Sequence, residues 1–326
     1  MRKVVATAFG SLDQLEIVEA PDLEPGPGEV VIDVEAAGAN FVDALFVQGR
    51  YQIKPPLPYT PGTEVAGRIA ALGAGVDGIE VGTRVVALPA VGGGYASQVA
   101  VRAASVISVP ERLSAGQAAG FVQSYGTMLY AYTRRTTVGP DEWVVVLGAG
   151  GGIGLAAVDI AASMGGRVIA CASSADKLAL ARAAGATETI DYSAADIDLK
   201  STIRELTGGG ADLVADPIGG PHAEPALRAL RWGGRYLVVG FAAGEIPRFP
   251  LNQVLLNSRM LIGIEWGAWI GRFPAENEVL MAELLQLVAD GTVNPVEPTA
   301  RPLDDAVGVL RDLQERRISG KVVLVP

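Results

Sequence analysis

The sequence predicts an α/β protein with two domains. A chain of 326 residues exceeds the length at which a single hydrophobic core usually stops growing. From about residue 140, short β-type runs alternate with helical segments, the pattern of βαβ units on a parallel sheet. The composition agrees, since 49% of the residues are hydrophobic, 41 are glycine and only 19% are charged. A buried, doubly wound sheet with tight strand-to-helix turns requires such a composition.

The predicted elements fall into three regions. Before residue 140 the chain has β-type runs at 29–34, 64–71 and 84–88, separated by turns such as EPGPG and PPLPYTPG, which indicates an irregular, strand-rich domain. The strands predicted for the parallel sheet are 143–148, 167–172, 188–192, 212–216, 235–240 and 260–264, with helices such as 175–184 and 225–230 between them. Helices at 276–290 and 303–316 and a strand at 321–325 follow. Because this tail is not another βαβ repeat, we expect it to return and complete the first domain.

Charge and cysteine content exclude several classes of protein. A formal net charge of -10 would repel a polyphosphate backbone, so nucleic acid is not an expected partner, and an anionic cofactor needs a local cationic site. The single cysteine, Cys171, excludes an intrachain disulfide. The first residues, MRKVVATAFGSLDQLEI, contain no apolar core of a secretory signal, and we expect a cytoplasmic location without a membrane partner.

A glycine-rich turn carries the strongest functional signal. The strand WVVVL is followed by GAGGGIG at 148–154 and then by the helical sequence LAAVDIAASMG. Glycines allow a tight turn and let backbone N–H groups approach a pyrophosphate, which lies at the positive end of the helix. An ordinary glycine-rich turn is the alternative, but the flanking strand and helix favour dinucleotide binding. The predicted contacts are Gly150, Gly151, Gly152, Ile153 and Gly154.

The end of the next predicted strand indicates which dinucleotide binds. An enzyme that uses NAD places Asp or Glu there to accept hydrogen bonds from the ribose hydroxyls, whereas this chain has Ser173 and Ser174, followed by Lys177. Two hydroxyls and a cation suit a 2′-phosphate, which favours NADPH. The alternative is that a serine only caps the helix that follows.

Metal ligands are too few for a zinc site. Catalytic and structural zinc sites take three or four ligands, chiefly Cys and His, and the chain has one of each. We therefore predict no metal, so hydrogen bonds must polarise the substrate. Cys171, inside the predicted sheet, is interpreted as a packing residue, and His222 as a loop residue without a functional role.

Several segments together resemble a known family: AGANFVDALFVQGRY, PYTPGTEVAGRIAALGAGV, GGGYASQVAV, the 148–154 loop, DPIGG and GGRYLVVGFAAGEIP. They are similar to quinone oxidoreductase, the zeta-crystallin-like branch of the medium-chain dehydrogenase/reductase superfamily, over essentially the whole chain. The resemblance implies a Rossmann domain at 123–265, which binds NADPH, inserted in a strand-rich, GroES-like catalytic domain made of 1–122 and 266–326. It also implies an active site in the cleft and a homodimer formed through an edge strand such as 260–264.

The resemblance also implies roles for particular residues. Zinc-bearing relatives have Cys and His where Asn40 and Thr63 stand here, so both ligand positions are vacant, and Glu64 remains as structural support. Tyr51 is implied to donate a hydrogen bond to the substrate oxygen; the alternative is a tyrosine at the lip of an apolar cleft. The remaining implied residues are Asn40 and Asp43 in the substrate pocket, Gln123 and Thr127 beside the nicotinamide, Tyr192 against the adenosine phosphate, and Gly240, Phe241 and Lys321 as further cofactor contacts. The alternatives are that Asn40 only satisfies buried loop backbone, that packing alone explains Tyr192, and that Lys321 is a solvated lysine at the start of a terminal strand.

The expected reaction is hydride transfer from NADPH to a quinone or to the β-carbon of an α,β-unsaturated carbonyl compound. Two alternatives stay open at this point. One is an enoyl-thioester or other double-bond reductase of the same superfamily, which acts on acyl thioesters. The other is a protein that binds NADPH without catalytic turnover, because a fold does not dictate an activity.

Overall fold

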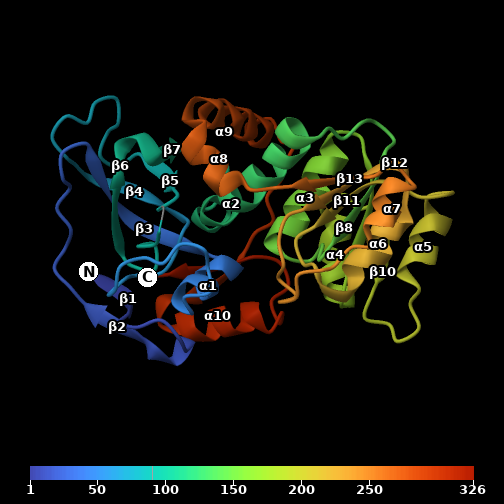
Figure 1. Ribbon diagram of the computed structural model, residues 1–326. Helices are drawn as coiled ribbons and strands as arrows, with labels where there is room; N and C mark the ends of the chain where they lie inside the picture. Colours follow the sequence, from blue (N-terminus) through green and yellow to red (C-terminus); the bar gives the residue numbers. More distant parts are fainter. Residues whose placement is uncertain (90) are drawn as a thin grey trace. The chain divides into compact units, whose positions relative to one another are not determined.

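The computed structural model describes residues 1–89 and 91–326 and divides into two compact units (Figure 1). The first unit comprises Met1–Gln123 and Glu297–Pro326, and the second comprises Ser124–Val296. The predicted limit at 265/266 is therefore displaced, because residues 266–296 belong to the second unit. Trp266 packs closely on Gly126 of the second unit, because a Cβ built on Gly126 would lie 2.7 Å from the Trp266 ring. Arg134 also pairs with Glu283 at 2.8 Å.

The first unit is built mainly on antiparallel strand pairs. A two-stranded sheet joins β1 (Arg2–Ala6) and β2 (Leu15–Glu19), and a seven-stranded sheet has the order β14-β15-β3-β4-β5-β7, with β6 also paired to β3. Its strands are β3 (Glu29–Ala39), β4 (Val65–Leu72), β5 (Arg84–Ala87), β6 (Gln98–Arg102), β7 (Val106–Ser108), β14 (Thr299–Pro302) and β15 (Val322–Val325). Two helices, α1 (Phe41–Val47) and α10 (Ala306–Gln314), pack against each other. The longer helix α2 (Ala115–Tyr130) contains the boundary between the units.

The last part of the predicted tail, residues 297–326, belongs to the first unit, whereas the helix predicted at 276–290 belongs to the second. β15 pairs antiparallel with β3, so that Val322 lies opposite Ala39 and Leu324 opposite Ala37. At the same end of β3, Gly38 allows a close approach, because a Cβ there would lie 2.1 Å from the carbonyl oxygen of Ala119. This pairing brings Lys321, the residue before β15, next to Asn40, the residue after β3.

The second unit is a parallel sheet with the strand order β10-β9-β8-β11-β12-β13. The strands are β8 (Trp143–Leu147), β9 (Arg167–Ala172), β10 (Glu188–Asp191), β11 (Ala211–Asp216), β12 (Leu230–Val238) and β13 (Met260–Gly263). Each predicted strand is present; five of the six agree with the prediction within one residue at each end, whereas β12 begins five residues before the predicted 235 and ends two residues before the predicted 240. The order reverses between β8 and β11, which makes the carboxyl ends of these strands the switch point where such sheets bind ligands.

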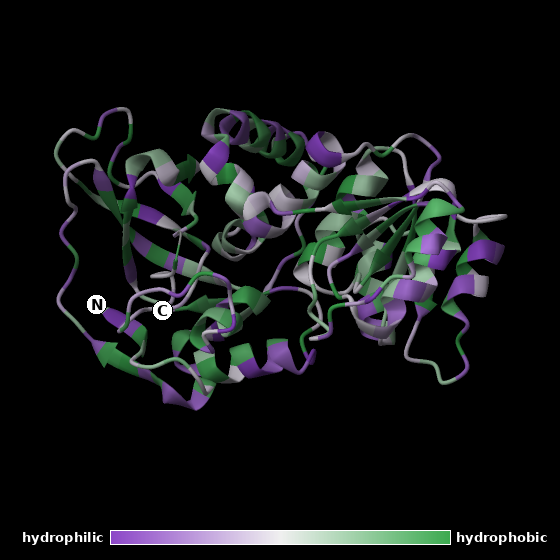
Figure 2. Cartoon of the chain, viewed as in Figure 1, coloured by the Kyte–Doolittle hydropathy of each residue, from purple (hydrophilic) through white to green (hydrophobic). Residues whose placement is uncertain are grey.

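Helices cover both faces of this sheet. α3 (Gly152–Ser163) and α4 (Ala175–Ala183) pack on β8, β9 and β10, whereas α5 (Leu199–Leu206) and α6 (Ala223–Ala229) lie together on the other face (Figure 1). The strands between them are largely hydrophobic (Figure 2). The remaining helices are α7 (Leu251–Leu255), α8 (Trp266–Arg272) and α9 (Pro274–Ala289). Within the described residues, no helix has the length and apolar character needed to cross a bilayer.

Candidate active site

The glycine turn leaves the carboxyl end of β8 and leads directly into α3. Gly148 has φ of 61°, Gly151 is the N-cap and Gly152 begins the helix. The N–H of Ala149 donates to the carbonyl oxygen of Cys171 at 3.0 Å, which ties the turn to the end of β9. The turn and the first turn of α3 thus present backbone N–H groups at a helix N-terminus.

The glycines of this turn differ in the space around them. A Cβ on Gly154 would lie 2.2 Å from the carbonyl oxygen of Gly148, and a Cβ on Gly150 would lie 2.4 Å from the Cβ of Lys177. A Cβ on Gly151 would meet nothing closer than 3.8 Å. Gly150 and Gly154 are therefore required by packing, whereas Gly151 leaves open space at the N-terminus of α3. This arrangement fits the close approach of a pyrophosphate to the backbone.

Ser173, Ser174 and Lys177 follow the neighbouring strand, β9. Ser174 is the N-cap of α4, and its hydroxyl accepts a hydrogen bond from the N–H of Lys177 at 3.4 Å. Ser174 therefore caps the helix, as the alternative interpretation holds, whereas Ser173 stays exposed. The Cβ and Cγ of Lys177 lie against Gly150, so its side chain starts beside the glycine turn.

The next strands contribute Tyr192, Gly240 and Phe241 to the same edge of the sheet. Tyr192 follows β10, and its ring stacks on that of His222 with centroids 4.2 Å apart and an interplanar angle of 27°. Gly240 follows β12 and donates its N–H to the carbonyl oxygen of Asp216 at 3.2 Å. Phe241 is 38% exposed. Cys171 is fully buried and burial raises the pKa of its thiol to about 12, which confirms its role in packing.

A buried carboxylate organises the polar residues of the first unit. Asp43 in α1 is 0% exposed and accepts three hydrogen bonds: from the N–H of Asn40 at 2.9 Å, the hydroxyl of Thr63 at 2.9 Å and the hydroxyl of Tyr95 at 3.0 Å. Burial raises the pKa of Asp43 to about 6, although these hydrogen bonds and the charge of Lys321 act in the opposite direction. Asp43 thus fixes the segments that contain Asn40, Thr63 and Tyr95.

A second buried carboxylate, Glu64, connects the remaining predicted residues. It accepts hydrogen bonds from the backbone N–H of Gln123 at 2.8 Å and from the amide of Asn40 at 3.4 Å. The ammonium of Lys321 lies 3.4 Å from Glu64 and also donates to the Oδ1 of Asn40. The hydroxyl of Thr63 and the side-chain oxygen of Gln123 are 3.3 Å apart, which links the two carboxylates into one network.

The structure thus brings four of the predicted residues together in the first unit, namely Asn40, Asp43, Gln123 and Lys321. Tyr51 is half-buried and packs its ring on Phe46 at a centroid distance of 4.6 Å. Thr127 lies on α2 one turn after Gln123, on the same helical face.

The sequence analysis did not single out Tyr95, which the structure places against Asp43. The available signal was an aromatic residue directly after three glycines.

The positions of Asn40 and Thr63 do not suit zinc. An amide and a hydroxyl are not the thiolate, imidazole or carboxylate ligands that zinc takes, and both side chains are engaged in the hydrogen bonds described above. Among residues 1–89 and 91–326, no group of three His, Cys, Asp or Glu side chains is placed to hold a metal ion.

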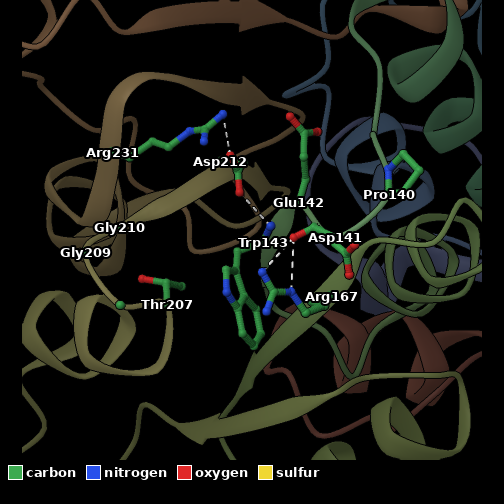
Figure 3. Close-up of a pocket in the computed structure, with 11 residues that line it drawn as sticks. Pro140, Asp141, Glu142, Trp143, Arg167, Thr207, Gly209, Gly210, Asp212 and Arg231 are labelled. Carbon is green, nitrogen blue, oxygen red and sulfur yellow. Dashed lines mark hydrogen bonds and ion pairs between the residues drawn. The ribbon is translucent and has the colours of Figure 1, made fainter.

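A cavity of about 520 Å³ opens at the opposite, amino-terminal edge of the second unit's sheet (Figure 3). Several of the charged groups that line it contact other residues of its wall. Arg231 forms an ion pair with Asp212 at 2.6 Å, Asp212 also accepts from the N–H of Trp143, and Arg167 lies over the Trp143 ring at 4.4 Å. These contacts hold the strand starts together, so we attribute a structural role to this edge.

Comparisons with known proteins agree with this architecture. Two family models match the chain, the alcohol dehydrogenase GroES-like domain at residues 26–111 and the zinc-binding dehydrogenase domain at residues 152–285. A quinone oxidoreductase-like protein 2 homolog of Nematostella vectensis is 34% identical, over 92% of this chain and 82% of its own length.

Solved structures are similar over the whole chain. The quinone oxidoreductase of Thermus thermophilus, solved alone and with NADPH, is 34% identical with a TM-score of 0.84, and the match covers 100% of both chains. The Escherichia coli quinone oxidoreductase complexed with NADPH is 29% identical with a TM-score of 0.89, again over 100% of both chains. The fold and site define a dehydrogenase/reductase with a GroES-like and a Rossmann unit. The chain belongs to the quinone oxidoreductase branch of the medium-chain dehydrogenase/reductase superfamily.

Proposed function

We propose that this oxidoreductase uses NADPH to reduce quinones or α,β-unsaturated carbonyl compounds by hydride transfer, without zinc. The observation that carries the proposal is the combination of an open N-terminus of α3 at Gly151 with a hydrogen-bonded polar network at Asn40 and Thr63. When bound, NADPH supplies a hydride from C4 of its nicotinamide. The chain itself supplies binding, orientation and hydrogen bonds.

The choice of NADPH rests on the carboxyl end of β9. No carboxylate follows Ala172 directly, and the exposed Ser173 stands where an enzyme that uses NAD has an acid. Lys177, which begins beside Gly150, adds a cation near the turn in a chain whose net charge is -10. The solved relatives from Thermus thermophilus and Escherichia coli were obtained with NADPH. The proposed cofactor contacts also include Gln123, Thr127, Tyr192, Gly240, Phe241 and Lys321.

Independence from zinc rests on the chemistry of the side chains. The chain has one Cys and one His; Cys171 is buried in the sheet, and His222 is stacked on Tyr192. Neither residue lies in the first unit with Asn40 and Thr63. Hydrogen-bond donors must therefore stabilise the charge that develops on the substrate oxygen.

We assign the donor role to Tyr51, because a phenol donates to a developing enolate or quinol oxygen without needing a metal. The packing of its ring on Phe46 restricts its orientation. Asn40 is the second candidate contact, since its amide is held in place by Glu64 and Lys321. Asp43 supports both, because it fixes the N-terminus of α1 through the N–H of Asn40.

We also propose that the protein forms a homodimer through the free edge of β13. Met260 and Leu261 on this strand are 48% and 38% exposed, and the neighbouring α7 region exposes Leu251, Leu255 and Leu256 by 70–79%. Apolar residues on an unpaired edge strand are otherwise an aggregation hazard. Light scattering on Leu255→Glu should show a monomer where the unmodified protein is a dimer, and a monomeric unmodified protein would refute the proposal.

The function is tested by following NADPH absorbance with a panel of small quinones, enals, enones and crotonyl-CoA, and NADH in parallel. We expect rapid oxidation of NADPH by quinones or enones, with NADH a poor donor. Selective turnover of crotonyl-CoA would assign the protein to the thioester reductases instead. Tight NADPH binding without turnover of any acceptor would contradict an enzymatic role.

A further inference from the structure

We propose that His222 is a positioning residue for cofactor selection: by stacking on Tyr192 it holds the phenol beside the ribose 2′-phosphate of NADPH. This inference rests on the proposed use of NADPH and adds a specificity determinant that the sequence did not indicate. The motivating contact is the ring stack, with centroids 4.2 Å apart and planes inclined by 27°. Such a stack restricts the rotation of both rings.

The backbone places Tyr192 next to the residue that distinguishes NADPH from NADH. Asp191, the last residue of β10, pairs with Ala172, the last residue of β9, and the N–H of Tyr192 donates to the Ala172 carbonyl oxygen at 3.0 Å. Tyr192 and Ser173 are therefore the first residues beyond two paired strands, at the same edge of the sheet. In this fold the residue at the end of β9 faces the ribose 2′ position. The proposal assigns the hydroxyl of Tyr192 to the same group.

The loop that carries His222 is held in place by a buried carboxylate. Asp216, at the end of β11, accepts the N–H groups of Ile218 at 2.9 Å and Gly219 at 2.8 Å, and it also accepts from the hydroxyl of Tyr236. Gly219 and Gly220 then turn the chain with φ of 63° and 65°, values that favour glycine. His222 therefore projects from a fixed turn at the start of α6.

Stacking of Tyr192 on a fixed ring reduces the conformational entropy that its side chain loses when NADPH binds. A free tyrosine side chain loses rotamer freedom when it binds a ligand, whereas a phenol already held against His222 has lost it beforehand. Since the 2′-phosphate is the only group that distinguishes NADPH from NADH at this position, the benefit falls on NADPH alone. The ring of His222 is the operative feature, so another flat ring should replace it.

The test compares His222→Ala with His222→Phe by fluorescence titration with NADPH and with NADH. We expect His222→Ala to bind NADPH roughly three- to tenfold more weakly, the range expected for the loss of one aromatic contact, with NADH affinity unchanged. His222→Phe, which keeps the stack, should restore most of the NADPH affinity. A His222→Phe variant as weak as His222→Ala, or an equal loss for NADH, would overturn the inference.

A second readout does not depend on the cofactor. Because the chain has a single histidine, its imidazole C–H signals in a proton NMR spectrum belong to His222 without further assignment. In Tyr192→Leu these signals should move downfield as the ring current of Tyr192 is lost; unmoved signals would refute the stack itself. If the stack is present but the unmodified protein binds no NADPH, the proposed function fails along with the inference. If NADPH binds and His222→Ala binds it equally well, the inference alone fails.

Discussion

The ammonium of Lys321 lies 3.4 Å from a carboxylate oxygen of Glu64, although 257 positions separate the two residues in the chain. The two side chains are only 9% and 0% exposed, so this is a buried ion pair rather than a surface contact. It joins the residue before β15 to the residue before β4, and Asn40 contacts both partners. This burial excludes the interpretation of Lys321 as a solvated lysine.

Removing one partner of this pair should be costly. Lys321→Met leaves the carboxylate of Glu64 buried without its cation, and we expect the free energy of unfolding to fall by about 3 kcal/mol. Chemical denaturation measures this change. The double variant Lys321→Met with Glu64→Gln removes the unpaired charge and should recover part of the loss. A single variant as stable as the unmodified protein would show that the pair is not buried in solution.

Asp43 should make stability depend on pH between about 4 and 6. The pKa of this carboxyl rises from 3.8 to about 6 on folding, so within this window the native state holds a proton that the unfolded state has released. Raising the pH through the window therefore lowers stability. In Asp43→Asn nothing titrates at this position. The fall in the free energy of unfolding across this pH window should therefore be smaller by on the order of 2–3 kcal/mol. Parallel stability curves for the two proteins would contradict the raised pKa.

Substitutions of two glycines in the turn after β8 should have different effects, one on stability and the other on NADPH binding. In Gly154→Ala the new Cβ meets the Gly148 carbonyl oxygen at 2.2 Å, so we expect a loss of several kcal/mol of stability. In Gly151→Ala the nearest atom is 3.8 Å away and stability should change by less than about 1 kcal/mol. The added methyl group would nevertheless occupy the place of the pyrophosphate and weaken NADPH binding at least tenfold. Thermal denaturation and NADPH titration measure the two effects, and equal NADPH affinity in Gly151→Ala would remove the turn from the cofactor site.

Tyr51→Phe tests the proposed donor to the substrate oxygen. Phenylalanine keeps the ring against Phe46 but lacks the hydroxyl, so kcat/KM should fall roughly 10- to 100-fold while the Kd for NADPH is unchanged. Steady-state kinetics and a binding titration give both quantities. Unchanged turnover would exclude Tyr51 from the chemistry.

The parallel sheet was predictable because its signals are local. Strands such as β8 and β9 are short apolar runs, and the glycine turn after β8 has a characteristic pattern, so residues 143–147 and 167–172 were located within one residue. The limit of the second unit was not predictable in this way. Residues 266–296 join that unit through contacts such as Trp266 with Gly126 and Arg134 with Glu283, which connect distant parts of the chain.

The candidate site was predictable as a set of residues but not as a network. The resemblance indicated Asn40, Asp43 and Lys321, yet no local pattern could show that Tyr95 donates to Asp43 across 52 positions. The stack of Tyr192 on His222 was unpredictable for the same reason, since the two residues follow different strands. Such contacts depend on strand order and loop conformation, which hydrophobic periodicity does not encode.

Hydride transfer from NADPH without zinc is tested by kinetics on metal-depleted protein. The protein would be dialysed against a chelator, its zinc content measured, and NADPH and NADH oxidation followed with a quinone and an enone. We predict full activity at zinc levels far below one per chain, with a kcat/KM for NADPH at least tenfold above that for NADH. Activity that disappears with the metal and returns on addition of zinc would contradict a zinc-independent reaction.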